Sequence, residues 1–196
     1  MFWTMARAPI GRQQLLTAAR DELVRGNGVL ELSALTQRAQ LSTGALYHHF
    51  GSKSGLLAAV YDDFYQGLRH AIADANLPAV IDWDVRERDR TRRFVVYHFD
   101  DPLAPILLSR ATLDPELAEL ETIHLQTMTE FAAENIRSGQ ESGQLPDDID
   151  ADSAAAFVIG GLRHSIAQQL RATPRTDPDH AAERLWHLTA AALGIA

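Results

Sequence analysis

The segment from residue 32 to residue 53 constrains the fold more than any other part of the sequence. Apolar residues recur at helical spacing from Leu32 to Ala39, and a second helix is expected from residue 42 to residue 50. Ser42 can cap this second helix, because its hydroxyl can accept a hydrogen bond from a free backbone N–H one turn along. The pattern is typical of a helix-turn-helix unit. The alternative is a pair of short core helices in an ordinary helical protein.

The second helix of this unit has an apolar residue, Leu46, on one side and polar groups on the others. Gly44 in its first turn allows the backbone to come close to another surface. Hydroxyl and imidazole groups are typical donors to phosphate oxygens, and a lysine follows the helix with a positive charge. A helix with these features suits the major groove of DNA. The candidate DNA-binding residues are Ser42, Thr43, Gly44, Tyr47, His48 and Lys53.

Residues 10–55 resemble the DNA-binding domain of the tetracycline-repressor (TetR) family of bacterial transcription regulators. The resemblance rests on a Ser-x-Gly-x-Leu-Tyr-x-His-Phe pattern, which is present from Ser42 to Phe50. It implies a three-helix DNA-binding domain, followed by a helical domain of a kind that varies widely within the family. Three positions depart from the family pattern, and one of them is Thr36, where alanine is usual. Gln40 stands where glycine is usual, so a left-handed backbone there costs about 1 kcal/mol, and Thr43 stands where many relatives carry Lys or Arg.

The remainder of the chain also shows helical patterns, without the alternation of strands. Together with the resemblance, these patterns predict an all-α fold with an N-terminal three-helix DNA-binding domain and a C-terminal helical bundle for ligand binding and dimerisation. The expected domains are residues 1–55 and residues 56–196, linked by a helix at 52–75. Further helices are expected at 10–25, 80–99, 103–111, 114–142, 151–172 and 179–193.

The net charge of −8 is distributed unevenly along the chain. Residues 1–56 carry six basic and three acidic residues, whereas residues 57–196 carry 12 basic and 23 acidic ones. A basic N-terminal part joined to an acidic remainder would orient the protein on DNA. No apolar run approaches the ~18 residues of a membrane span, so we expect a cytoplasmic protein with no membrane partner.

Motifs for catalysis and for metal binding are not evident. The sequence has no recognisable nucleophile motif, phosphate loop or paired-carboxylate pattern. Its eight histidines lack the spacing of a helical zinc motif, and it contains no cysteine. We therefore expect a protein that is not an enzyme and that has no cofactor and no metal site.

The second domain admits two hypotheses. In the first, a small-molecule effector enters an interior with apolar walls and a few polar anchors, which suits a mostly hydrophobic ligand. In the second, the domain docks a protein partner and has no small-molecule effector. A deep apolar cavity would favour the first hypothesis, and a filled core the second. The candidate ligand-binding residues are Phe94, Tyr97, His98, Leu107, Arg110, His124, Met128, Phe131, Phe157 and His164.

The last two helices, at 151–172 and 179–193, are apolar over more than one face, which is more than a single partner helix requires. This excess predicts a homodimer through these helices, although both could instead pack entirely within one chain. A dimer is also expected because one small helix-turn-helix reads too few bases to select a site. Its double-stranded DNA should be an approximate inverted repeat. The candidate interface residues are Gly161, Ile166, Leu185, Leu188 and Ala192.

Overall fold

The computed structural model describes residues 10–73, 82–110 and 115–195, and every regular element in these ranges is an α-helix. The all-α prediction is confirmed, and the observed helix ends lie within three residues of the predicted ones. The helices are α1 (Ile10–Arg25), α2 (Leu32–Ala39), α3 (Thr43–Phe50), α4 (Lys53–Ile72), α5 (Trp83–Asp100), α6 (Ala104–Arg110), α7 (Pro115–Glu141), α8 (Ala151–Arg171) and α9 (Pro178–Ala192).

Local sequence signals set the boundaries of the helix-turn-helix. The hydroxyl of Ser42 accepts a hydrogen bond from the N–H of Ala45 at 3.2 Å, and that of Ser52 accepts one from Gly55 at 2.8 Å. These two hydroxyls cap α3 and α4 at their N-termini. Gln40 ends α2 with φ of 53° and ψ of 36°, which is the left-handed conformation that a glycine would adopt more easily.

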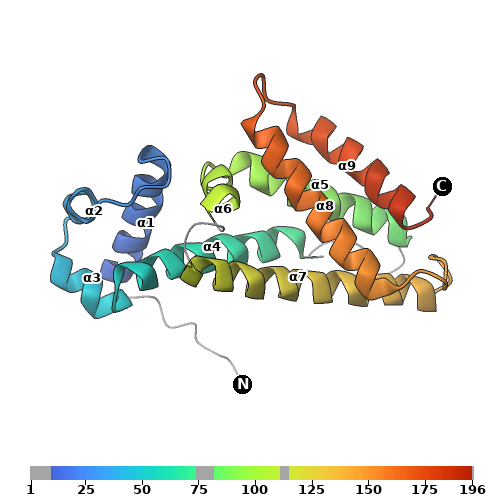
Figure 1. Ribbon diagram of the computed structural model, residues 1–196, viewed down its shortest axis with the longest axis horizontal. Coiled ribbons are helices and arrows are strands. Elements are labelled where there is room, and N and C mark those ends of the chain that lie inside the picture. The colour runs from blue at the N-terminus through green and yellow to red at the C-terminus, as the bar shows by residue number, and fades with distance from the viewer. Residues whose placement is uncertain (1–9, 74–81, 111–114, 196) are drawn as a thin grey trace.

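Helices α1, α2 and α3 pack together and against the beginning of α4 (Figure 1). Leu15, Leu35, Leu46 and Leu56 are completely buried where these helices meet. Burying one leucine side chain stabilises a fold by roughly 1.5–3 kcal/mol. This packing fixes α3 by its Leu46 side and leaves its opposite side facing solvent.

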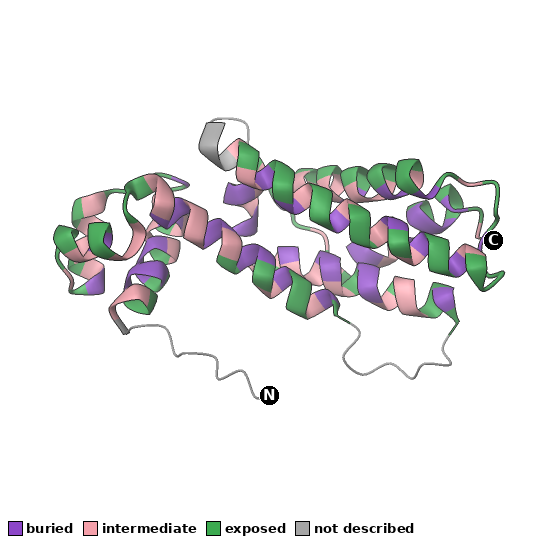
Figure 2. Cartoon of the chain, turned by 90° about the horizontal axis from the view of Figure 1, so that it is seen from below, coloured by how far each residue is buried: buried purple, intermediate pink, exposed green. Residues whose placement is uncertain are grey.

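Helix α4 continues from the helix-turn-helix into the C-terminal bundle (Figure 1). There α5 lies beside α9, α7 lies beside α8, and α4 packs against both α5 and α7. Figure 2 shows buried residues along the inward sides of these helices and exposed residues along their outer sides. A second hydrophobic cluster, around Trp83, Ile136 and Trp186, lies in this bundle. No helix in the described part of the chain is long and apolar enough to cross a membrane.

Candidate DNA-binding surface and ligand cavity

The predicted DNA-binding residues lie on the outer side of α3 and at the adjoining start of α4. Tyr47 is 49% exposed although it is aromatic, and the other five are also exposed. Leu46 points the opposite way and is completely buried. Core packing by Leu46 therefore leaves the outer side of α3 to solvent, and all six predicted residues are exposed.

Gly44 lies at an open point of this surface. A Cβ atom added there would meet only the hydroxyl oxygen of Ser42, at 3.6 Å. Internal packing therefore does not require a glycine at this position. A glycine is useful here because it lets the backbone of α3 approach an external partner closely.

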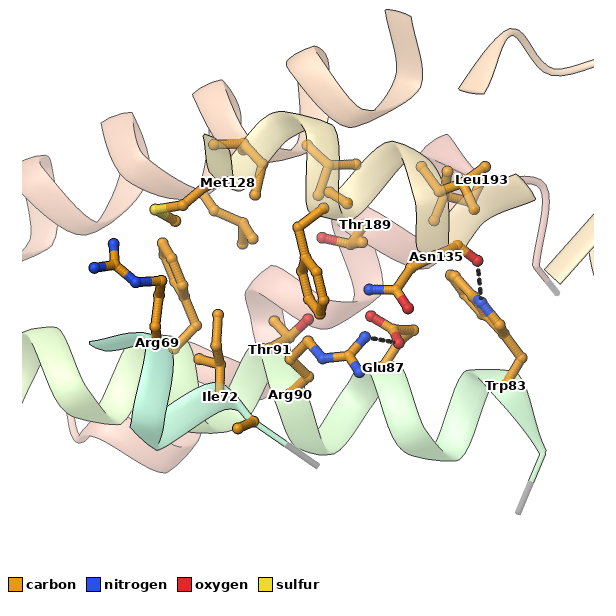
Figure 3. Close-up of a pocket in the computed structure, with 18 of the residues that line it drawn as sticks. Arg69, Ile72, Trp83, Glu87, Arg90, Thr91, Met128, Asn135, Thr189 and Leu193 are labelled. Atoms are coloured by element: carbon orange, nitrogen blue, oxygen red, sulfur yellow. Dashed lines mark hydrogen bonds and ion pairs between the residues drawn. The ribbon is translucent and has the colours of Figure 1, made fainter. Parts of the chain in front are cut away.

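A cavity of about 270 Å³ lies between α4, α5, α7, α8 and α9 (Figure 3). Its walls are mostly apolar, and three of the ten predicted ligand-binding residues, Phe94, Met128 and Phe131, contribute to them. Arg69 and Ile72, from the last turn of α4, close one side of the cavity. The helix that begins beside the candidate DNA-binding surface therefore ends at the cavity wall.

Two predicted ligand-binding residues lie on the outer surface of the bundle. Phe157 is 70% exposed on the outer side of α8, and His164 is exposed two turns further along the same helix. Neither lines the cavity, because α8 packs against α7 by its other side. For Arg110, the last residue of α6, the side chain lies outside the described part of the structure.

Three other predicted ligand-binding residues belong to the packed core. Leu107 is buried in the main hydrophobic cluster. The hydroxyl of Tyr97 donates to the backbone oxygen of Phe64 at 2.9 Å, and burial raises the pKa of Tyr97 to about 12. The Nδ1 atom of His98 lies 2.8 Å from the backbone oxygen of Phe94. Because His98 is buried, its pKa falls to about 4, and the imidazole is neutral near pH 7.

His124, the last of the predicted polar anchors, takes part in a polar network between α4 and α7. Its ring stacks on Tyr65, with centroids 4.3 Å apart, and its Nε2 atom lies 3.0 Å from Oδ1 of Asp62. Burial lowers the pKa of His124, opposed by the hydrogen bond to Asp62. The Tyr65 hydroxyl donates to Glu121 at 2.8 Å, and Glu121 also pairs with Arg163 of α8. This network holds the bundle together and leaves His124 away from the cavity.

The polar residues of the cavity were not predicted from the sequence. Glu87 and Arg90 of α5 form an ion pair that lines it. Arg90 is only 7% exposed, and its guanidinium lies 5.2 Å from the ring centroid of Phe131. The signal was the spacing of Trp83, Glu87, Arg90 and Phe94, which puts both charges in phase with two aromatic residues.

Asn135 of α7 also lines the cavity (Figure 3). Its backbone oxygen accepts a hydrogen bond from Nε1 of Trp83 at 2.8 Å. Its side-chain nitrogen, Nδ2, is buried and has no hydrogen-bond partner among the described residues. The cavity thus has an available donor beside a paired cation and anion.

The outer sides of α8 and α9 form an exposed apolar face. Leu188 is 66% exposed, Ala192 is exposed, and a Cβ atom added at Gly161 would meet nothing within 4 Å. Ile166 and Leu185, which were also predicted for the interface, are buried in the main core. They point inward because each helix needs one apolar side for its own bundle, so they are not available to a second copy.

The fold and these surfaces define a class of protein, a DNA-binding regulator with a helix-turn-helix and a hollow helical domain. Residues 15–60 match the sequence pattern of the bacterial regulatory proteins of the tetR family. The transcriptional regulator BetI of Burkholderia cenocepacia is 32% identical over 144 residues, which cover 67% of this chain and 68% of BetI. The chain therefore belongs to the TetR family and is a transcriptional regulator.

Solved structures share the whole architecture. A regulatory protein of the tetR family from Rhodococcus RHA1 has a TM-score of 0.74 at 23% identity, over 95% of this chain and 98% of that one. The regulator RolR, solved with its ligand resorcinol, has a TM-score of 0.65 at 22% identity, over 94% of this chain and 92% of RolR. These likenesses support the all-α fold with an N-terminal helix-turn-helix.

Proposed function

We propose that the protein is a homodimeric repressor that binds an approximate inverted repeat and is released from it by a small, mostly hydrophobic ligand. The observation that carries this proposal is the position of α4. Lys53 begins this helix beside the candidate DNA-binding surface, and Arg69 and Ile72 end it at the cavity. A ligand that displaces the end of α4 would therefore reorient the helix-turn-helix.

Helix α4 is suited to transmit such a displacement because it is a single uninterrupted element. Its 20 residues span about 30 Å. Leu56, at its start, is buried against α1 to α3, whereas Phe64 and Leu68 are buried further along, in the same continuous core. We place the boundary between a DNA-binding domain, residues 1–55, and a regulatory domain, residues 56–196, in the first turn of this helix.

To act as a switch, the ligand must bind the DNA-incompetent arrangement more tightly than the DNA-bound one, since equal affinity would shift nothing. The cavity provides apolar surface for such a ligand between five helices, and α4 is one of them. RolR, which has the same fold, was solved with a small molecule. These observations favour a ligand-responsive regulator over a domain that only docks a protein.

Dimerisation through the outer face of α8 and α9 would complete the proposed repressor. Burying the exposed Leu188 and Phe157 side chains against a second copy would remove apolar surface from water. Glycines at 160 and 161 leave room for close approach of a partner helix. The dimer would hold two α3 helices about 34 Å apart, one turn of DNA, or a multiple of that distance.

DNA binding and release can be tested together. Purified protein is titrated onto the DNA that flanks its own gene, with and without a metabolite library, and binding is followed by fluorescence anisotropy and footprinting. We expect a protected inverted repeat, and release by at least one mostly hydrophobic compound. A protected site from which no compound releases the protein would contradict the ligand response but not DNA binding. Equal affinity for the flanking DNA and for scrambled DNA would contradict sequence-specific repression.

A further inference from the structure

The residues that line the cavity indicate more about the ligand than that it is mostly apolar. We infer that it accepts a neutral, mostly apolar molecule of one or two rings, whose hydroxyl group hydrogen-bonds to Asn135. This inference rests on the proposed function, because it names the chemical class of the effector. It follows from a buried amide donor of the wall that has no hydrogen-bond partner among the described residues, from the charge balance of the wall and from the size of the cavity.

The donor is Nδ2 of Asn135, which lines the cavity and lacks a partner among the described residues. A buried amide without a hydrogen bond costs about 1–3 kcal/mol, so the cavity favours an occupant that supplies an acceptor there. A hydroxyl group both accepts and donates. It can therefore satisfy the N–H of Asn135 and also bond with an oxygen of the same wall.

The remaining polar groups of the wall favour a neutral ligand. The charge of Arg90 is already compensated by Glu87, which is also part of the wall. Thr91 and Thr189 add only neutral hydroxyls, and Figure 3 shows their oxygens in the same region as Asn135. Arg69, the other cation of the lining, is exposed at the end of α4, and Figure 3 shows it at the opposite end of the cavity from Asn135. A carboxylate placed beside Asn135 would therefore meet the anionic Glu87 and lose its hydration, which is costly.

The size of the cavity limits the apolar body of the ligand. A dry cavity of about 150 Å³ lined by aliphatic and aromatic side chains binds benzene. The present cavity, at about 270 Å³, has room for a substituted benzene or two fused rings. Aromatic and aliphatic side chains such as Phe94, Met128 and Ile136 surround that space, so the body of the ligand should be apolar.

Four matched compounds test the inference on the full-length wild-type protein. These are 4-propylphenol, its methyl ether, propylbenzene and 4-propylbenzoate, with affinities measured by isothermal titration calorimetry at pH 7. A phenol is neutral at this pH because its pKa is about 10. We expect the phenol to bind about tenfold more tightly than propylbenzene, the value of one net hydrogen bond. The methyl ether should lie between them, and the benzoate should bind most weakly.

The variant Asn135→Leu removes the donor and keeps the size of the side chain. It should bind the phenol and propylbenzene with similar affinity. Glu134→Leu makes the same kind of change on the exposed side of α7 and should keep the wild-type preference. The comparison of the four compounds on the wild-type protein stands even if Asn135→Leu does not fold.

The inference is overturned if the benzoate or propylbenzene binds more tightly than the phenol, if no phenol binding is detected, or if folded Asn135→Leu keeps the preference. Release of DNA is measured separately with the same compounds. Release by propylbenzene or the benzoate, but not by the phenol, would keep the proposed switch and reject the ligand class. Tight binding of the phenol without release of DNA would keep the ligand class and reject the switch.

Discussion

Arg20 of α1 forms an ion pair with Asp101, the residue that follows α5, and so ties the helix-turn-helix to the C-terminal bundle. The other oxygen of the Asp101 carboxylate accepts a hydrogen bond from the N–H of Leu103 at 2.9 Å, at the turn into α6. Arg20 also lies 3.6 Å from Asp63 of α4. One arginine therefore connects α1, α4 and the end of α5, the helix whose beginning lines the cavity.

This ion pair should be measurably coupled. In a double-mutant cycle of Arg20→Ala and Asp101→Asn, we expect a coupling energy of about 1 kcal/mol in urea unfolding, because Asp101 is largely buried. The exposed pair Arg88–Glu183, at 2.6 Å, provides the control and should couple by less than about 0.5 kcal/mol. Additive effects at Arg20 and Asp101 would show that the pair does not connect the two parts energetically.

Replacing Lys53 by alanine should weaken DNA binding equally for all sequences. If its ammonium contacts one phosphate, the slope of log K against log salt should fall in magnitude by about one. Binding measured by anisotropy between 50 and 200 mM salt, roughly the range over which such slopes are resolved, gives this value. Arg171→Ala, at the far end of α8, should leave the slope unchanged. An unchanged slope in Lys53→Ala would rule out its phosphate contact.

Replacing Gly44 by leucine should abolish specific DNA binding while the protein remains folded. In the protein without DNA there is room for a side chain at this position, so the melting temperature should change little. On DNA the leucine would hold α3 away from the base edges. Gly44→Ala should give a smaller loss. Normal operator affinity in Gly44→Leu would contradict docking of α3 in the groove, whatever its stability.

A charge on the outer face of α8 and α9 should prevent dimerisation. Leu188→Asp places a carboxylate in the proposed interface, where an unpaired buried ion costs several kcal/mol. Because Leu188 is exposed in a single chain, the monomer should still fold. Sedimentation should show a dimer for the wild type and a monomer for the variant. As a control, the variant Val85→Asp, at a half-exposed position of α5, should remain a dimer. A wild-type protein that is monomeric at micromolar concentration would refute the interface.

His98 should make the protein less stable in mild acid. Burial lowers its pKa to about 4 in the folded state, against about 6.5 when unfolded. The unfolded chain thus binds more protons than the folded one between these pH values. The stability that depends on a neutral His98 is therefore fully present above pH 6.5 and is lost as the pH falls toward 4. At pH 5 the loss from this residue is roughly 2 kcal/mol.

The pH effect is measured as the difference in unfolding free energy between pH 7 and pH 5. In His98→Leu that difference should shrink by about the same 2 kcal/mol, because the titrating group is gone. His70→Leu, on the exposed side of α4, should retain the wild-type difference. Arg163 lowers the pKa of the His98 imidazole and Asp101 raises it, so these two charges oppose each other and burial is the main cause of the shift. Equal pH dependence in His98→Leu and the wild type would refute this assignment.

The helices and the candidate DNA-binding surface were predictable because their determinants are local. Ser42 and Ser52 cap helices with their own hydroxyls, and the resemblance to the TetR family marked Gln40 as the turn position where a glycine is usual. Leu46 is buried in α3, and Phe50, one turn further along, packs against the same core. Each of these features depends on residues within about one or two helical turns of each other.

The cavity was only partly predictable. Phe94, Met128 and Phe131 were identified as apolar residues on long helices, and they do line it. His98 and His124 were expected to be anchors because histidine is polar, yet each is engaged with groups of the packed core. Which polar side chain reaches a cavity depends on the rotation of its helix against several neighbours, and sequence spacing within one helix does not give that rotation.

By itself, the sequence determined an all-helical chain with a helix-turn-helix near its N-terminus and apolar faces on its last two helices. Only the tertiary structure decided that Glu87, Arg90 and Asn135 face one cavity, that Ile166 and Leu185 face the core, and that Phe157 faces solvent. The physical reason is the range of the interactions. Helix periodicity and capping act over a few residues, whereas burial depends on which helices, far apart in the sequence, pack against one another.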